Sequence, residues 1–302
     1  MAPITTSETA NGIPTIVAKR ALENLKSNSV LSRLVARDWD DEVATAGQTV
    51  DIVNFGAMTT SLKNAGSAYT VQAPSDAKKS VTLNKQRHFS FVIEDTARLF
   101  ARPDYLAGLI DKGVKQMAAD IDADIAALYS GFSQSINATG GLAQTNFTNA
   151  RRLLSKALAP QDQRYAVLHP DAAAELLNLA GYTNRDYRSQ AEESQLVKGY
   201  LAGGSSFAGF EIYEDQNIVQ STNNKNLFFH REAIALVVRP LPAPDASTGV
   251  MARTVSVDGM SLRVMMQYDI SQGGYQVVCD CLYGVAELRD AFGVTVLTAA
   301  AS

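Results

Sequence analysis

Three aspartates stand at alternate positions within residues 120–124 (DIDAD), which is how a calcium-binding loop begins. Such a loop needs glycine at its sixth position and glutamate at its twelfth, and the chain has isoleucine and glycine there. The triplet also falls inside a predicted helix. Residues four apart on a helix share a face, so we expect Asp120 and Asp124 to lie together and Asp122 to point elsewhere. We interpret the triplet as a solvated helix face and not as a metal site.

The cysteines and histidines do not form a recognisable reactive site. Cys279 and Cys281 are two residues apart, so on a strand they point to the same face, and we expect two reduced, buried side chains. The three histidines are far apart in sequence, and His169, which precedes a proline at a helix start, is predicted to cap or pack. No nucleophile, base and oxyanion donor occur in a known arrangement. We therefore predict no catalytic residue, no cofactor, no metal and no enzyme activity.

Composition limits the class of protein. The chain has 302 residues, of which 46% are hydrophobic and 19% charged, so it can bury a core in two domains or one large one. Lys and Arg number 27 against 31 Asp and Glu, a net charge of −4 that disfavours a broad nucleic-acid-binding face. No apolar run approaches the roughly 20 residues of a membrane span. The polar N-terminus lacks the pattern of a secretory signal, so we expect a protein made in a cytosol without a membrane partner.

Residues 54–79 are rich in Gly, Ala, Ser, Thr and Asn and carry only scattered large apolar side chains. Strand patterns flank this segment at 49–53, 81–83 and 89–93. The sequence predicts a long two-stranded excursion with a loose tip. A structureless loop of this length is uncommon in a compact domain unless it is functional or disordered. Two interpretations stay open, a mobile surface loop and an arm that lies on another subunit.

Charge is distributed unevenly along this part of the chain. Basic residues without an intervening acid end the excursion, whereas an acidic run precedes it. A positive arm that met a negative patch on a neighbouring copy would set the register of the contact more than its affinity. The alternative is two solvated loops. The candidate intersubunit contacts are Lys78, Lys79, Lys85 and Arg87 on the basic side, and Asp38, Asp40, Asp41 and Glu42 on the acidic side.

The strongest helix signal is a continuous apolar stripe at every third or fourth position from Pro103 to about Ser130. Such a helix would be about 42 Å long and could act as a strut across a flat molecule. Shorter helices at 146–158 and 170–179 surround a strand at 165–168, which indicates an α/β block. Beyond residue 207 strand patterns dominate, at 210–213, 227–229, 233–238, 261–267, 275–279, 282–288 and 294–298.

The order of several segments resembles the major capsid (coat) proteins of tailed bacteriophages, most closely the coat family of short-tailed phages. The resemblance covers nearly the whole chain, and each segment alone is weak. In chain order they are AGQTVDI (46–52), SVTLNKQRHF (80–89), DIDADIAALY (120–129), RYAVLHP (164–170), FAGFEIYE (207–214), FHREAIAL (229–236) and LYGV (282–285).

This resemblance implies a flat, wedge-shaped α+β subunit with an extended hairpin loop, a peripheral domain and an axial domain that has a central sheet. The short interruption at 240–249 leaves no room for an inserted β-barrel. The implied parts are an N-terminal arm and helix at 1–44, the extended loop at 45–94, the peripheral domain at 95–164 with a spine helix at 103–130, a mainly axial part at 165–260, and C-terminal strands that return to the peripheral domain at 261–302.

The resemblance also implies the function. The chain would be a non-enzymatic shell protein that assembles through pentamers and hexamers, in the host bacterial cytoplasm, into the icosahedral capsid of a virion. The shell would enclose double-stranded DNA without sequence-specific binding, and its partners would be further copies with scaffolding, portal and cement proteins. Two alternatives stay open. One is an encapsulin-type compartment that holds an enzyme cargo, and the other is a cytosolic enzyme with a mobile lid at 54–88.

Overall fold

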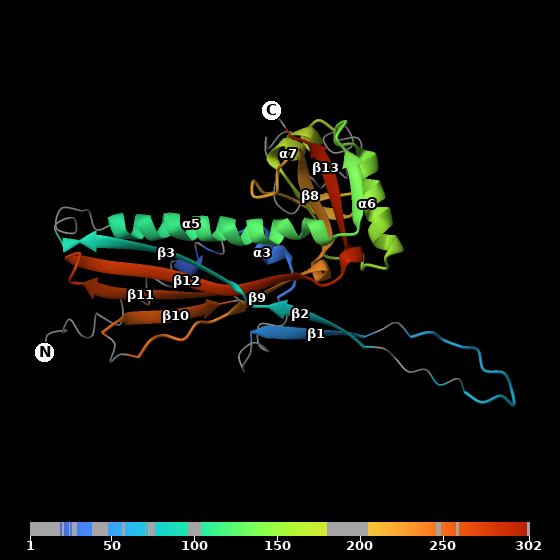
Figure 1. Cartoon of the computed structure of the whole chain (residues 1–302). Coiled ribbons are helices and arrows are strands. Elements are labelled where there is room, and N and C mark those ends of the chain that lie inside the picture. Colours follow the sequence, from blue (N-terminus) through green and yellow to red (C-terminus); the bar gives the residue numbers. More distant parts are fainter. Residues whose placement is uncertain are drawn as a thin grey trace, which may run out of the picture.

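The computed structural model describes residues 19, 21–23, 25, 29–37, 48–55, 58–69, 71, 76–95, 104–179, 205–245, 249–257 and 260–300. These form an α+β subunit with two large sheets, one long helix and a two-stranded hairpin that projects from the body (Figure 1). The expected fold class is confirmed. The α-helices are α3 (Leu31–Leu34), α5 (Asp104–Ala126), α6 (Gln144–Lys156) and α7 (Pro170–Leu177), and the 3-10 helices are η2 (Ala127–Gly131), η4 (Arg231–Ala233) and η6 (Asp290–Phe292).

A five-stranded antiparallel sheet lies under helix α5 (Figure 1). Its order is β10–β11–β12–β3, and β9 pairs with the C-terminal part of β12. The apolar stripe of α5 packs on this sheet because its helical spacing puts Val114, Ile121 and Ile125 on one buried face. The strands are β3 (Lys85–Glu94), β9 (Ile234–Arg239), β10 (Met251–Val257), β11 (Met260–Asp269) and β12 (Gly274–Glu287).

A six-stranded mixed sheet forms the other half of the body, with the order β4–β13–β8–β5–β7–β6. Helices α6 and α7 accompany it at one end of α5 (Figure 1). Phe147 of α6 packs edge-on against Phe228 of β8, with 5.1 Å between ring centroids, so the helix is tied to the sheet by aromatic contacts. The strands are β4 (Gln134–Ala138), β5 (Arg164–Leu168), β6 (Ser205–Phe207), β7 (Phe210–Glu214), β8 (Asn223–His230) and β13 (Gly293–Ala299).

The hairpin consists of β1 (Thr49–Phe55) and β2 (Asp76–Thr82), paired antiparallel from Thr49↔Thr82 to Phe55↔Asp76. It lies on the side of the five-stranded sheet away from α5 and extends beyond the body (Figure 1). The predicted two-stranded excursion is therefore confirmed. The strand at 85–94 is not part of it, because all ten of its residues pair with β12.

Several boundaries differ from the sequence-based expectation. The spine helix ends as an α-helix at Ala126 and tightens into η2, so its α-helical part is about 35 Å long and not 42 Å. The strands expected at 275–279 and 282–288 are one continuous strand, β12. Strands β4, β6 and β10 were not predicted. They lie at sheet edges, where burial on one side only leaves a weak pattern.

Strand pairing divides the chain at other points than the expected domain boundaries. Strand β4 and helix α6, expected with the spine helix, lie with the six-stranded sheet. Strand β13, expected to return to the spine helix, pairs with β8 and β4. These assignments depend on contacts between residues more than 60 positions apart, which local sequence patterns do not encode.

Candidate assembly site

The base of the hairpin is held together on its outward face by polar contacts. Lys78 Nζ lies 2.5 Å from Asp51 Oδ2, and Ser80 Oγ donates a hydrogen bond of 2.6 Å to Asp51 Oδ1. The hydrogen bonds from Lys78 and then Ser80 hold the pKa of Asp51 below its usual value. The pair is exposed and contributes little stability. The contacts join Asp51 of one strand to two residues of the paired strand.

The tip of the hairpin exposes large apolar side chains to solvent. Leu62 is 93% exposed and Val71 is 92% exposed, and Met58 and Tyr69 are exposed as well. The tip still has internal order, since Ser67 Oγ donates to the Asn64 carbonyl at 2.8 Å and Lys63 Nζ lies 4.2 Å from the centroid of the Tyr69 ring. Exposed apolar side chains gathered on one projecting segment are typical of an interaction surface. We call residues 58–71 the tip.

The other face of the hairpin base packs on the body through a small hydrophobic cluster, which we call the seat. Four side chains come from the hairpin and its exit, and they pack on small residues of β9 and β12. This cluster is separate from the main core. Its buried members are Val50, Ile52, Val81, Leu83, Ala235 and Val237, with Ala286 and Leu288 partly buried beside them.

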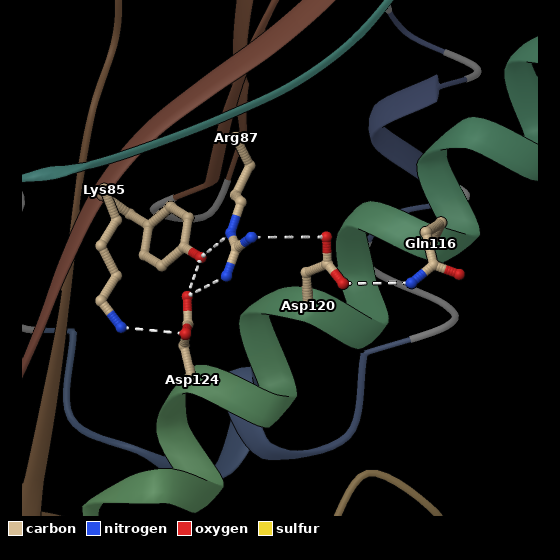
Figure 2. A network of polar contacts seen from close by, with 6 residues as sticks. Lys85, Arg87, Gln116, Asp120 and Asp124 are labelled. Atoms are coloured by element: carbon tan, nitrogen blue, oxygen red, sulfur yellow. Dashed lines mark hydrogen bonds and ion pairs between the residues drawn. The ribbon is translucent and has the colours of Figure 1, made fainter.

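A polar network, which we call the clamp, ties the start of β3 to helix α5 and to β12 (Figure 2). Asp124 is its centre. Its Oδ1 lies 2.9 Å from Lys85 Nζ, and its Oδ2 accepts hydrogen bonds from Arg87 Nη2 at 3.1 Å and from the Tyr283 hydroxyl at 2.5 Å. Arg87 Nη1 also lies 3.9 Å from Asp120 Oδ2. The clamp therefore joins three elements with balanced charge, two cations against two carboxylates.

The ionisation of the clamp follows from these bonds. Burial alone would raise the pKa of Asp124, but the hydrogen bonds from Tyr283, Lys85 and Arg87 outweigh burial and lower that pKa. Burial, and then the bond to Asp124, raises the pKa of Tyr283. The bonds to Tyr283 and Asp124 raise the pKa of Arg87. Asp124 and Arg87 therefore stay charged at neutral pH, and the Tyr283 hydroxyl stays protonated.

A second carboxylate of α5 anchors the segment that precedes the hairpin. Asp122 is fully buried and accepts hydrogen bonds from the Val30 amide at 2.7 Å, the Ser32 amide at 3.1 Å and the Ser29 hydroxyl at 3.0 Å. Burial, and then the charge of Asp215, raises the pKa of Asp122 to about 7, against the effect of these hydrogen bonds. Asp122 thus connects residues 29–34 to the long helix.

The prediction of a solvated helix face at 120–124 is wrong for two of the three aspartates. Asp122 is buried, and Asp124 is bonded within the clamp. The expectation that Asp120 and Asp124 share a face and that Asp122 points elsewhere is confirmed, since Arg87 reaches both of the former. A signal was present, because Asp122 follows Ala118 by four positions and precedes Ile125 by three, which places it on the buried stripe.

The candidate contact residues are placed as follows. Lys78 lies on the outward face of the hairpin, and Lys79 is exposed on the opposite face, where its charge acts on Glu287. Lys85 and Arg87 lie together in the clamp of their own chain. The acidic residues Asp38, Asp40, Asp41 and Glu42 lie outside the described residues. Sequence reasoning did not single out Tyr283, which belongs to no spaced motif, and it considered Asp124 only as part of the triplet at 120–124.

The remaining candidate positions have structural roles. Cys279 and Cys281 are buried free thiols of β12, as expected, and burial followed by the charge of Asp280 raises the pKa of each to about 12. His169 caps α7, as expected, by accepting from the Asp171 amide at 3.3 Å. Across the described ranges, no group of three or more His, Cys, Asp and Glu side chains is placed to hold a metal ion. No described helix is long and apolar enough to cross a membrane.

The fold is that of viral capsid subunits. A chain of Mycobacterium phage Che8 is similar with a TM-score of 0.66 at 18% identity, over 89% of this chain and 90% of that one. The capsid structure of cyanophage P-SCSP1u gives 0.67 at 15% identity, over 90% and 89%. The capsid of a native GTA particle gives 0.59 at 12% identity, over 90% and 91%. No curated protein matches the chain by sequence.

Residues 76–296 match the family described as phage capsid protein, and the chain belongs to this family. It is a major capsid protein with a structural role and not an enzyme, and it forms a homo-oligomeric shell in the virion. The resemblance to phage capsid proteins seen in the sequence is confirmed. The encapsulin-type compartment is not favoured, because the family and the similar structures are those of phage capsids and a GTA particle. The enzyme with a lid is excluded by the same findings.

Proposed function

We propose that copies of this chain assemble through pentamers and hexamers into a closed icosahedral shell around double-stranded DNA, and that the hairpin reaches onto a neighbouring copy. One observation carries the proposal. The tip exposes large apolar side chains, whereas the base of the same hairpin is fixed to the body by the seat and the clamp. A segment that is held at one end and uncovered at the other is suited to bind a second copy.

The energetics of the hairpin support this use. Ordering a residue costs about 1–2 kcal/mol of backbone entropy, and among the described residues of the tip no side chain is buried to offset that cost. A two-stranded ribbon alone is marginal in water. The surface of another copy would cover Leu62 and Val71 and supply the missing contacts. Contacts of this head-to-tail kind close into rings when the rotation allows.

Charge supports the same arrangement. Lys78 and Lys79 are exposed on the hairpin and are proposed contacts for the acidic residues Asp38 to Glu42 of a neighbour. Lys85 and Arg87 are partly exposed within the clamp, with 34% and 44% of their side chains accessible, so they both fix the hairpin base and face a neighbour. The net charge of −4 fits a shell that surrounds DNA without gripping its sequence.

Further partners belong to the same proposal. A subunit whose contacts are individually weak closes a shell of the right size with the help of scaffolding, portal and cement proteins. Assembly would take place in the cytoplasm of the host bacterium. Membership of the phage capsid family supports these partners.

The test removes the tip and keeps the paired strands. In one variant a four-residue Gly–Ser linker replaces residues 58–71. In a matched variant Met58, Leu62, Tyr69 and Val71 become Ser, and the length is kept. Wild type, co-expressed with its scaffolding protein if required, should give closed polyhedral particles by negative-stain electron microscopy and sedimentation. Both variants should give folded subunits that do not close. Normal particles from the shortened variant would contradict the proposed role of the hairpin.

A further inference from the structure

Gly284 of β12 lies directly beneath the point where the hairpin leaves the body. A Cβ atom at this position would lie 2.9 Å from the Thr82 carbonyl carbon, closer still to its oxygen, and 3.2 Å from the Leu83 Cα. Ordinary contacts of this kind begin at about 3.4 Å. The two backbones therefore touch, and only glycine allows them to do so.

The residues around Gly284 form the surface on which the base of the hairpin rests. Gly284 pairs with Val237, and the neighbouring pair on the same face is Ala286↔Ala235, so the body offers a platform of small side chains. The last backbone bond of the hairpin, from the Leu83 amide to the Gln48 carbonyl, measures 2.8 Å and lies next to this platform. The apolar side chains of the seat press the hairpin onto it.

The clamp fixes the chain on the other side of the same point. Strand β3 begins at Lys85, which pairs with Tyr283, the residue before Gly284. Between Thr82 and Lys85 only two residues turn the chain from the hairpin into the sheet. The direction of the hairpin is thus set over these two residues. The backbone contact at Gly284 holds the chain before them, and the clamp holds the chain after them.

We propose that Gly284 is a positioning residue that sets the angle at which the hairpin leaves the subunit, and through that angle the geometry of the contact between copies. The second part rests on the proposed function of the hairpin. A side chain at 284 has to lift the Thr82 end of the hairpin by about 1 Å. Because the seat is about 10 Å long, this lift tilts the hairpin. The same tilt moves residue 62, about 30 Å farther along, by about 3 Å.

The chain offers a matched control at the other end of the same strand. A Cβ at Gly274 would lie 2.8 Å from the Glu94 Cα and closer still to the Ile93 oxygen. The steric clash with the backbone is therefore about equal, but it occurs where β12 meets β3, far from the hairpin. Gly274→Ala and Gly284→Ala should lower the thermal midpoint of the subunit to a similar extent.

The angle is measured on the unassembled subunit with spin labels on Leu62→Cys and Lys112→Cys, both exposed positions on the hairpin tip and on α5. The native cysteines are buried and do not compete for the label. Pulsed electron paramagnetic resonance should show a shift of about 3 Å in the mean label distance for Gly284→Ala. The distribution for Gly274→Ala should match wild type. Unchanged distances in Gly284→Ala, or equal shifts in both variants, overturn the proposal.

A second variant covers the case in which Gly284→Ala does not fold. Leu83→Ala removes a buried side chain from the seat without a backbone clash, and it should broaden the distance distribution. An unbroadened distribution counts against the proposal. The shells form a separate readout, in which Gly274→Ala should close with the wild-type diameter and Gly284→Ala should give open or irregular particles. If wild type forms no shell even with its scaffolding protein, the proposed function fails and the label distances still decide the role of Gly284.

Discussion

The body of the subunit and its hairpin are stabilised by different kinds of contact. In the body, side chains from distant parts of the chain interlock, as where the Phe228 ring lies 5.1 Å from that of Phe147 and 5.2 Å from that of Phe210. The hairpin has no such interior. Its base depends on the seat, a cluster with six buried residues, and its tip is uncovered. The body therefore has a core of its own, whereas the described residues of the tip have none, and we propose that another copy covers them.

This difference separates residues that determine stability from residues that determine assembly. Substitutions in the body should lower the free energy of unfolding, and they should affect shells only because fewer subunits are folded. Substitutions at the tip should leave unfolding unchanged and still prevent closure. The clamp lies between these extremes, because it holds the start of β3 directly after the hairpin, whereas Asp122 belongs to the body.

The largest effect on stability is expected from Phe228→Ala. Phe228 is fully buried, and loss of its ring leaves a cavity that costs about 3–5 kcal/mol. Because whole domains are stable by only about 5–15 kcal/mol, much of the subunit should be unfolded. Urea denaturation measures the change. Phe228→Leu, which keeps most of the volume, should cost about 1.5 kcal/mol or less. An unchanged midpoint for the alanine variant would show that the body is not organised by this contact.

The next effect is a dependence of stability on pH that originates at Asp122. Its pKa is raised from 3.8 to about 7 in the folded subunit, so between these values the folded state binds more protons than the unfolded state. Stability therefore falls as pH rises from about 4 to about 7 and is level above. Between pH 5 and pH 7 the contribution is about 2–3 kcal/mol. Urea denaturation of the unassembled subunit across this range measures the slope.

Two variants assign that slope to its source. Asp122→Asn has no proton to gain and should abolish this part of the slope, although it weakens the bonds to residues 29–32. Asp215→Asn removes the neighbouring negative charge and should shift the slope to lower pH. Asp120→Asn, two residues away and in the clamp, should leave it in place. Burial also raises the pKa of Asp215, so a smaller slope should remain in Asp122→Asn, and an undiminished slope would place the main titrating group elsewhere.

A smaller effect is expected in the clamp. Asp124→Asn removes the charge that holds Lys85 and Arg87, and Tyr283→Phe removes the donor to the same carboxylate. We expect each to cost about 1–2 kcal/mol, since the residues are only partly buried. The double variant should cost less than the sum of the two, by about 1 kcal/mol, because both act on one network. Urea midpoints of the four proteins test this. Strict additivity would mean that the clamp is not cooperative.

The smallest effect on unfolding is expected at the tip. Leu62→Ser should change subunit stability by less than about 0.5 kcal/mol, because the side chain is 93% exposed. It should nevertheless reduce the yield of closed particles measured by sedimentation. Leu158→Ser is a matched control, an exposed leucine of the body at 87% exposure. Equal yields from the two variants would remove the distinction between tip and body.

Much of the fold was predictable from local patterns. The stripe on α5, the strands of the hairpin and the alternation around β5 all follow from spacing within about 25 residues, where side-chain periodicity is strong. Strands β4, β6 and β10 were not predictable, and neither was the placement of β3 in the body. Strands β3 and β4 pair with partners distant in sequence, which local patterns do not contain. Strands β6 and β10 pair with the next strand along the chain, but they lie at sheet edges, where burial leaves a weak pattern.

The candidate site was predicted in part. The polar, apolar-poor composition of residues 54–79 identified the projecting hairpin, and the role of the basic residues that end it stays a prediction. Their surroundings were not foreseen. Asp124 and Tyr283 are 159 positions apart, so no spacing rule could join them in the clamp. Gly284 carries no local signal either, because its role is to leave room for Thr82, a residue about 200 positions earlier.

The sequence by itself determined which segments can bury an apolar face and which cannot. It therefore determined that the subunit has a body with a core and one exposed hairpin without a core. It also determined family membership through the order of its segments. Tertiary structure decided that the Asp122 carboxylate is buried, which charged side chains contact Asp124, and where the hairpin rests on the sheet. The physical reason is that periodicity acts over a few residues, whereas desolvation, charge pairing and backbone contact depend on which distant surfaces the folded chain brings together.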